Sequence, residues 1–169
     1  MSLTIVTYPD PILTTPCKPV EEVNDEIRAL VAEMRDIIVE KDAVGLAANQ
    51  VGRSLRLFVV DIWWMNTGNT DNALTFINPS LTLGKGYQKR IEGCLSFPQM
   101  SEEIVRADTL RVNALGLDGE SFSMDAQGLL AVAIQHEYDH IEGKTFMDRM
   151  GSLTRRMFKK KLIVESSKA

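Results

Sequence analysis

Both histidines of this chain, His136 and His140, stand in the segment at 136–140, which reads HEYDH. If the segment is helical, residues four positions apart share one face, so both imidazoles can bind one metal ion. Glu137 would then lie beside that ion and could take a proton from water. The same residue types also occur on ordinary helix surfaces, but the apolar run at 129–134 predicts a buried helix. Burying two imidazoles and a carboxylate without a function is unfavourable, so the pattern favours metal-assisted hydrolysis.

A catalytic site of this kind needs a third protein ligand and leaves one position for water. A related pattern, HExxHxxGxxH, is matched as far as Gly143, but Phe146 stands where its third histidine is expected. Glu165 has the spacing of a downstream glutamate ligand, although it lies near the end of a basic segment that is expected to fray. Cys94 follows Gly93 in a predicted turn, and a thiolate with two imidazoles would accept zinc, iron(II), cobalt or nickel. On the residues alone, Cys94 and Glu165 both remain candidates.

The composition is that of an ordinary globular protein, with 44% hydrophobic and 25% charged residues. Its length fits one domain over residues 1–169. The net charge of -4 is uneven, because seven basic residues and one acidic residue follow position 148, whereas residues 1–148 carry -10. No apolar stretch approaches the ~18 residues that span a bilayer and the start lacks a secretory signal, so we expect a cytoplasmic protein, with an organellar origin also open. Two cysteines, Cys17 and Cys94, are too few for a disulfide scaffold.

One early helix and several strands are predicted before the metal-binding helix. Asn24 is a suitable cap for an early amphipathic helix that ends near residue 41. Strand-like runs follow at 55–62, 74–77, 109–115 and 121–124, and the last two can form a hairpin. Asp125 is a suitable cap for the helix that carries the histidines, and Gly143 is a suitable stop. This order predicts an α+β fold in which small mixed or antiparallel sheets pack around a central metal-binding helix.

Three segments, taken together, resemble those of peptide deformylases. They read AVGLAANQ at 43–50, EGCLS at 92–96 and QHEYDH at 135–140, in the order that this family has. The likeness extends from the proline-rich start to about Met150. It implies a metal-dependent hydrolase that removes the N-formyl group from the formyl-methionine of newly made polypeptides and releases formate. A metallopeptidase with Glu165 as third ligand, and a non-catalytic binding module with the same fold, are the alternatives.

The resemblance also implies roles for individual residues. Its metal ligands are Cys94, His136 and His140, with iron(II) as the native metal and zinc, nickel or cobalt as replacements. Glu137 would be the general base and later the proton donor to the amine, while the Gln50 side-chain amide and the Leu95 backbone N–H would face the developing oxyanion. The residues implied at the substrate are Val44 and Gly45 for its backbone, and Leu129, Val132 and Ala133 for the methionine side chain.

The chain departs from the family pattern at two places. Ala43 stands where the first glycine of its motif is expected, which is unfavourable by roughly 1 kcal/mol if that position needs a positive φ. The segment after Pro98 is acidic where bacterial relatives often carry a basic residue, so preferences beyond methionine stay open. Near the metal, we expect Asp139 to orient the site through an ion pair with Arg106.

The C-terminal segment at 148–165 combines basic residues with spaced apolar ones, and we expect a basic amphipathic helix there. Its predicted apolar face consists of Met150, Leu153, Met157 and Leu162. In bacterial relatives the C-terminal helix contacts the ribosome, so the basic face of this one is a candidate for contact with rRNA phosphates. A solvated helix packed on the body of the protein is the simpler interpretation.

Overall fold

The computed structural model describes residues 2–167, which form a five-stranded sheet, a two-stranded sheet and four α-helices. The strands are β1 Gly45–Ala47, β2 Leu57–Val60, β3 Leu74–Leu83, β4 Tyr87–Gly93, β5 Ser101–Ala107, β6 Thr109–Leu115 and β7 Ser121–Gln127. The helices are α1 Asp25–Glu40, α2 Trp64–Thr67, α3 Gly128–Ile141 and α4 Ser152–Ser167. The large sheet has the order β1-β2-β3-β6-β7 and the small sheet pairs β4 with β5, all antiparallel. The predicted α+β class is confirmed.

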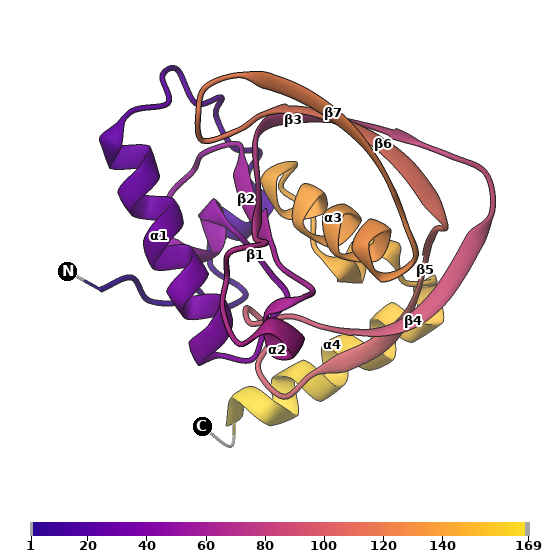
Figure 1. Ribbon diagram of the computed structural model, residues 1–169. Coiled ribbons are helices and arrows are strands. Elements are labelled where there is room, and N and C mark those ends of the chain that lie inside the picture. The colour runs from indigo at the N-terminus through magenta and orange to yellow at the C-terminus, as the bar shows by residue number, and fades with distance from the viewer. Residues whose placement is uncertain (1, 168–169) are drawn as a thin grey trace.

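α3 lies at the centre of the molecule. Figure 1 shows strands β3, β6 and β7 passing on one side of it and the β4–β5 hairpin on the other, with α4 crossing below. Ten of its fourteen residues are buried, including both histidines. A helix that is covered on nearly every side offers its polar side chains a site away from bulk water. The helix predicted to bind a metal is therefore the central one.

β2 separates α3 from α1, because alternate side chains of a strand face opposite sides. Phe58 and Val60 pack in the hydrophobic cluster that includes α3, while Leu57 and Val59 join the cluster that includes the buried face of α1. The side chain of Asn24 caps α1 as predicted, by accepting a hydrogen bond of 3.1 Å from the first turn. Burial of one apolar side chain such as Leu57 or Val59 contributes about 1.5–3 kcal/mol, so packing against β2 holds α1 in place.

The start of α3 differs from the prediction, and its end agrees with it. Asp125 is not the cap, because β7 continues to Gln127 and pairs with β6 over its whole length. Gly128, with φ of 61°, makes the turn from strand to helix. Gly143 has φ of 76°, and a Cβ there would lie 2.8 Å from the backbone nitrogen of Pro16. Glycine at 143 thus ends the helix and lets the N-terminal segment cross it closely.

The sequence pattern does not predict β4 and β5, which form a hairpin between the strand-like runs at 74–77 and 109–115. The C-terminal helix is present, but it begins at Ser152, after a 3-10 turn at Phe146–Arg149. It packs through Phe158, whereas Leu153 and Met157 are 67% and 54% exposed, so that part of the predicted apolar face is wrong. Within residues 2–167, no helix is both long and apolar enough to cross a membrane.

Candidate active site

Cys94, His136 and His140 come together beside α3. Their ligand atoms all lie within 4.8 Å of one another, and Cys94 Sγ is 3.3 Å from His140 Nε2. The two histidines are one turn apart on α3, and Cys94 follows directly after the end of β4. With metal–nitrogen bonds of about 2.0 Å and metal–sulfur bonds of about 2.3 Å, tetrahedral ligand atoms lie about 3.3–3.6 Å apart. The distance between Cys94 and His140 and the donor types of all three residues therefore fit one divalent metal ion.

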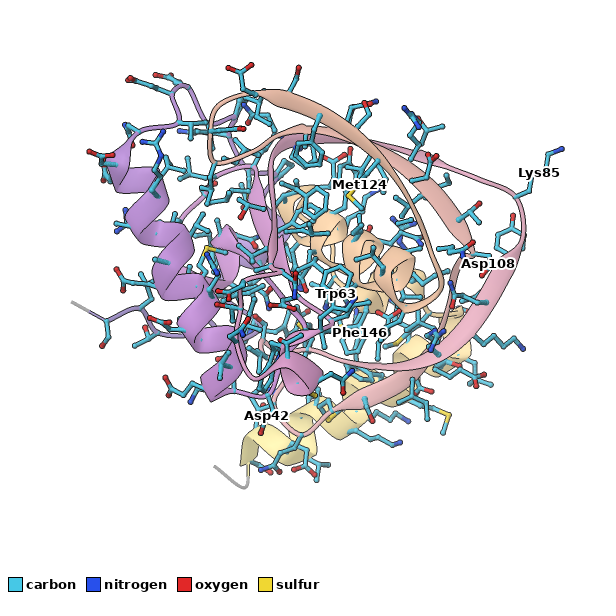
Figure 2. All side chains as sticks on the ribbon, in the orientation of Figure 1. Asp42, Trp63, Lys85, Asp108, Met124 and Phe146 are labelled. Carbon is cyan, nitrogen blue, oxygen red and sulfur yellow. The ribbon has the colours of Figure 1, made fainter. Side chains whose placement is uncertain are left out.

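The structure separates the two candidates for the third ligand. The potential metal-binding group found among residues 2–167 contains Cys94, whereas Glu165 lies near the end of α4 and is not part of it. Phe146, at the position of a third histidine in the related pattern, lies beneath α3 (Figure 2) with its ring centroid 5.8 Å from that of His136. Its ring also packs against those of Phe97 and Phe158, with centroid distances of 5.2 and 5.4 Å. The site is thus closed on this side by an apolar wall.

A buried network of charged residues holds His136. The Nδ1 of His136 is 2.8 Å from a carboxylate oxygen of Glu92, and Arg106 donates two hydrogen bonds of 2.9 Å to the same carboxylate. Arg106 also donates to Asp139 at 2.6 Å, so the predicted contact between these two is present. Arg149 adds two hydrogen bonds to Asp139, of 2.6 and 3.0 Å. Two carboxylates and two guanidiniums thus balance each other behind the metal ligand.

The pKa shifts agree with this arrangement. Burial alone would raise the pKa of Glu92, but the hydrogen bonds from Arg106 and His136 outweigh it and lower the pKa to about 2. Burial lowers the pKa of His140 well below its usual value, which keeps the imidazole neutral, as a metal ligand must be. Burial also acts to lower the pKa of His136, but hydrogen bonds with Cys94 and Glu92 raise it overall, so a metal ion bound there displaces a proton.

Glu137 is buried next to the ligands, and one of its carboxylate oxygens, Oε2, has no hydrogen-bond partner among residues 2–167. Burial raises its pKa to about 7, against the lowering effect of the His136 charge. A carboxyl group with a pKa in this range can both accept and donate a proton near neutral pH. Gly45 makes room for it, because a Cβ at that position would lie 2.9 Å from Glu137 Cγ and Oε1. Glycine at position 45 therefore leaves space for Glu137, in addition to its predicted role at the substrate backbone.

Gln50 also lies next to the ligands, in the 3-10 turn at Ala48–Val51. Its Oε1 accepts a hydrogen bond of 3.0 Å from the Ala47 backbone. Its Nε2 lies 3.5 Å from Cys94 Sγ and 3.2 Å from Ser96 Oγ. The side-chain amide is thus fixed with its N–H groups toward the metal ligands. Ser96 is 1% exposed and belongs to the EGCLS segment, but residue types alone did not distinguish it as a partner of Gln50.

A pocket of about 680 Å³ lies beside these groups. All the residues predicted at the substrate line it: Val44, Gly45, Leu129, Val132 and Ala133. Leu95, Gln50 and Glu137 line it as well, so the structure brings the predicted catalytic and substrate residues to one cavity. The Leu95 backbone N–H takes part in none of the hydrogen bonds within residues 2–167. β1 is an edge strand of the large sheet, which leaves one side of its backbone open to an extended peptide.

Ala43 causes no backbone strain at the entrance to β1. The residue with the left-handed conformation is Asp42, with φ of 54°, and Ala43 is not among the positive-φ residues, so the condition for the penalty is not met. The Ala43 carbonyl accepts a hydrogen bond of 2.7 Å from the Trp64 indole. Asp61 in turn accepts hydrogen bonds from the backbone of Trp63 and Trp64, at 2.9 and 3.0 Å. The segment that follows β2 therefore fixes the residue that precedes β1, beside the pocket.

Comparison with known proteins agrees with the geometry. A sequence model of the polypeptide deformylase family matches residues 2–156. A peptide deformylase of Acidobacterium capsulatum is 46% identical over 151 residues, which cover 89% of this chain and 88% of that protein. The crystal structure of a peptide deformylase from Legionella pneumophila superposes with a TM-score of 0.89 at 36% identity, covering 99% of this chain and 96% of that one. The chain belongs to the polypeptide deformylase family.

Proposed function

We propose that this protein hydrolyses the N-formyl group of N-terminal formyl-methionine in newly made polypeptides and releases formate. The observation that carries the proposal is that Glu137, whose Oε2 has no hydrogen-bond partner among residues 2–167, lines the same largely apolar pocket as Cys94 and His136 of the metal-binding group. Family membership supports the same reaction. We therefore take the metal group, the base and the pocket as one catalytic site.

The residues of the chain account for the proton movements of this reaction. Glu137 takes a proton from the water that adds to the formyl carbon. The oxygen of the formyl group then becomes negative and faces the Gln50 side-chain amide and the Leu95 backbone N–H. As the bond between carbon and nitrogen breaks, Glu137 returns the proton to the amine of methionine, and formic acid leaves. Water and the formyl amide are consumed, and formic acid and a free amine are the first products. The acidic proton of formic acid then passes to the amine, which leaves formate and an ammonium group, so atoms and charge balance.

Cys94, His136 and His140 would hold one divalent metal ion, and iron(II) is the native metal that we propose, with zinc, nickel or cobalt as replacements. When bound, the ion supplies Lewis acidity at the formyl group and the attacking water. A soft thiolate with two imidazoles suits each of these metals. Glu92, Arg106 and Asp139 orient His136 toward it.

The substrate is proposed to lie along the open edge of β1. Val44 and Gly45 would offer it backbone groups, as an edge strand offers them to an added strand. The methionine side chain would enter the apolar part of the pocket at Leu129, Val132 and Ala133, where Val132 and Ala133 are almost fully buried and Leu129 is 42% exposed.

The decisive experiment is an assay of formate release from a formyl-methionyl peptide, with protein purified without oxygen and analysed for metal. We expect Glu137→Gln to keep its metal and lose about 10²–10⁴-fold in kcat, because the base is gone. Cys94→Ala should lose the metal. Wild-type rates of formate release from Glu137→Gln would refute the assignment of the base, and metal retained with full activity in Cys94→Ala would refute the ligand set.

We also propose that α4 contacts the ribosome, where formylated chains emerge, and that the protein acts in the cytoplasm. The exposed surface of α4 combines the basic residues Arg156, Lys159, Lys160 and Lys161 with exposed apolar residues. Basic side chains that neutralise phosphates give binding that weakens steeply with salt. Co-sedimentation with ribosomes at 50 and 200 mM salt tests this, and a Lys159→Glu, Lys160→Glu, Lys161→Glu protein should lose binding. Equal co-sedimentation of this variant and the wild type would contradict the proposal.

A further inference from the structure

Three polar residues occupy alternate positions on the face of β4 that is turned toward α3: Gln88, Arg90 and Glu92. Gln88 Nε2 donates a hydrogen bond of 3.0 Å to the Gly128 carbonyl at the start of α3. Glu92 contacts His136, two turns further along α3. Arg90 lies between them and lines the pocket. Two members of the row are thus used to attach β4 to α3, and the third is turned to the cavity.

The side chain of Arg90 is positioned, but its charge is not matched by a protein group. Its Nε donates a hydrogen bond of 2.8 Å to Gln88 Oε1, and Gln88 is itself anchored on Gly128. Its Nη2 lies 4.0 Å from the place of a Cβ on Gly128, next to Leu129 of the pocket wall. None of the ion pairs among residues 2–167 includes Arg90. A guanidinium held in this way offers two N–H groups to a carboxylate.

The other charged groups of the pocket leave this rim positive. Glu92 is neutralised in the buried ion network. Glu137 lies at the metal-binding end of the cavity. Lys41 and Asp42 bring one charge of each sign from the segment before β1. Arg90 is therefore the unbalanced charge at the rim beside α3, and it favours an anionic ligand there.

The position of Arg90 indicates which residue of the substrate it would contact, and this inference rests on the proposed function. In an extended peptide, alternate side chains point to the same side, about 7 Å apart. With methionine among Leu129, Val132 and Ala133, the third residue points to the same side as methionine, and the second points away. We propose that Arg90 binds the carboxylate of an acidic side chain at the third residue of the formylated substrate, and so favours Asp or Glu over Asn or Gln at that position.

The test compares four formyl peptides with amidated C-termini, so that the tested side chain supplies the single carboxylate or its amide counterpart. They are formyl-Met-Ala-Glu-Ala, formyl-Met-Ala-Gln-Ala, formyl-Met-Glu-Ala-Ala and formyl-Met-Gln-Ala-Ala. We expect kcat/KM of the metal-loaded protein to be about fivefold higher for Glu than for Gln at the third position, the upper range for a partly exposed ion pair. The ratio at the second position should stay near one. Raising the salt to 1 M should bring the third-position ratio toward one, because screening weakens the pair.

Variants assign the preference to Arg90. In Arg90→Met the ratio at the third position should fall to about one, and in Arg90→Glu below one. Lys89→Met removes the same charge from the opposite face of β4 and should keep the ratio. A preference that is absent in the wild type, that appears at the second position instead, or that survives in both Arg90 variants would overturn the inference. Absence of formate release from every peptide would instead count against the proposed function.

Discussion

Replacing Gly45 with alanine tests the close contact between β1 and the proposed base. The added Cβ would lie 2.9 Å from Glu137 Cγ and Oε1, whereas ordinary contacts begin at 3.4 Å. The backbone of Gly45 is held by its pairing with Val60, so Glu137 must give way by about half an ångström or turn its carboxylate. A misplacement of ~1 Å lowers a rate by about 10²-fold. We therefore expect kcat to fall by about tenfold to a hundredfold.

The assay is kcat for formate release, expressed per bound metal ion. Gly151→Ala is the matched control, because nothing lies within 4 Å of its added Cβ and its φ is not in the left-handed range. Metal content should be unchanged in Gly45→Ala, since the methyl group contacts Glu137 rather than Cys94 or the histidines. A Gly45→Ala protein with wild-type kcat would refute the steric reasoning. A loss of activity that only follows a loss of metal would refute it as well.

Three further predictions concern groups that support the site. Ser96→Ala should lower kcat by about tenfold, less than the loss of a whole oxyanion donor, because Gln50 loses one of its hydrogen bonds; wild-type kcat would contradict this. Arg149→Met should release metal to a chelator about threefold to tenfold faster, because Asp139 loses two hydrogen bonds, with Arg149→Lys intermediate; equal release rates would contradict it. The pKa of Glu92 is lowered from 4.5 to about 2 when folded, so its stabilisation is complete above pH 4.5 and is lost as the pH falls to about 2. This stabilisation amounts to about 3 kcal/mol. The free energy of unfolding in urea, measured between pH 5.5 and 2, should therefore fall less with decreasing pH in Glu92→Gln than in the wild type; an equal fall in both proteins would contradict this.

The sequence predicts the apolar elements of this fold well. The stripe of α1 and the apolar run of α3 follow directly from residue spacing, because both helices bury a face against β2. The ends of α3 show the limit of such reasoning. Asp125 has the side chain of a helix cap, yet the backbone pairing of β7 with β6, in which Asp125 lies opposite Arg111, keeps it in a strand. Gly128 at φ of 61° makes the turn, and a positive φ is not visible in the residue type alone.

The site was predictable in its ligands and in one supporting contact, that of Arg106 with Asp139, but not in the rest of the network behind them. The four-residue spacing of the two histidines predicts two metal ligands, and the EGCLS segment indicates Cys94 as the third through its resemblance to peptide deformylases. The charges behind His136 come from three other segments, and no spacing along the chain relates Glu92 to Arg106 or Arg149 to Asp139. Arg149 is separated from α3 by a turn, so its contact depends on how the chain folds back.

The polar face of β4 explains why this strand cannot be read from its sequence. A strand is predicted when one of its faces is apolar and packs on a core. The inner face of β4 carries Gln88, Arg90 and Glu92 because α3 offers it a backbone carbonyl, an open pocket and an imidazole rather than apolar side chains. Its outer face is exposed at Tyr87 and Ile91. The strand therefore has the reverse of the usual pattern for the same reason that it belongs to the site, and a polar row of this kind beside a metal-binding helix is itself evidence that the strand takes part in binding.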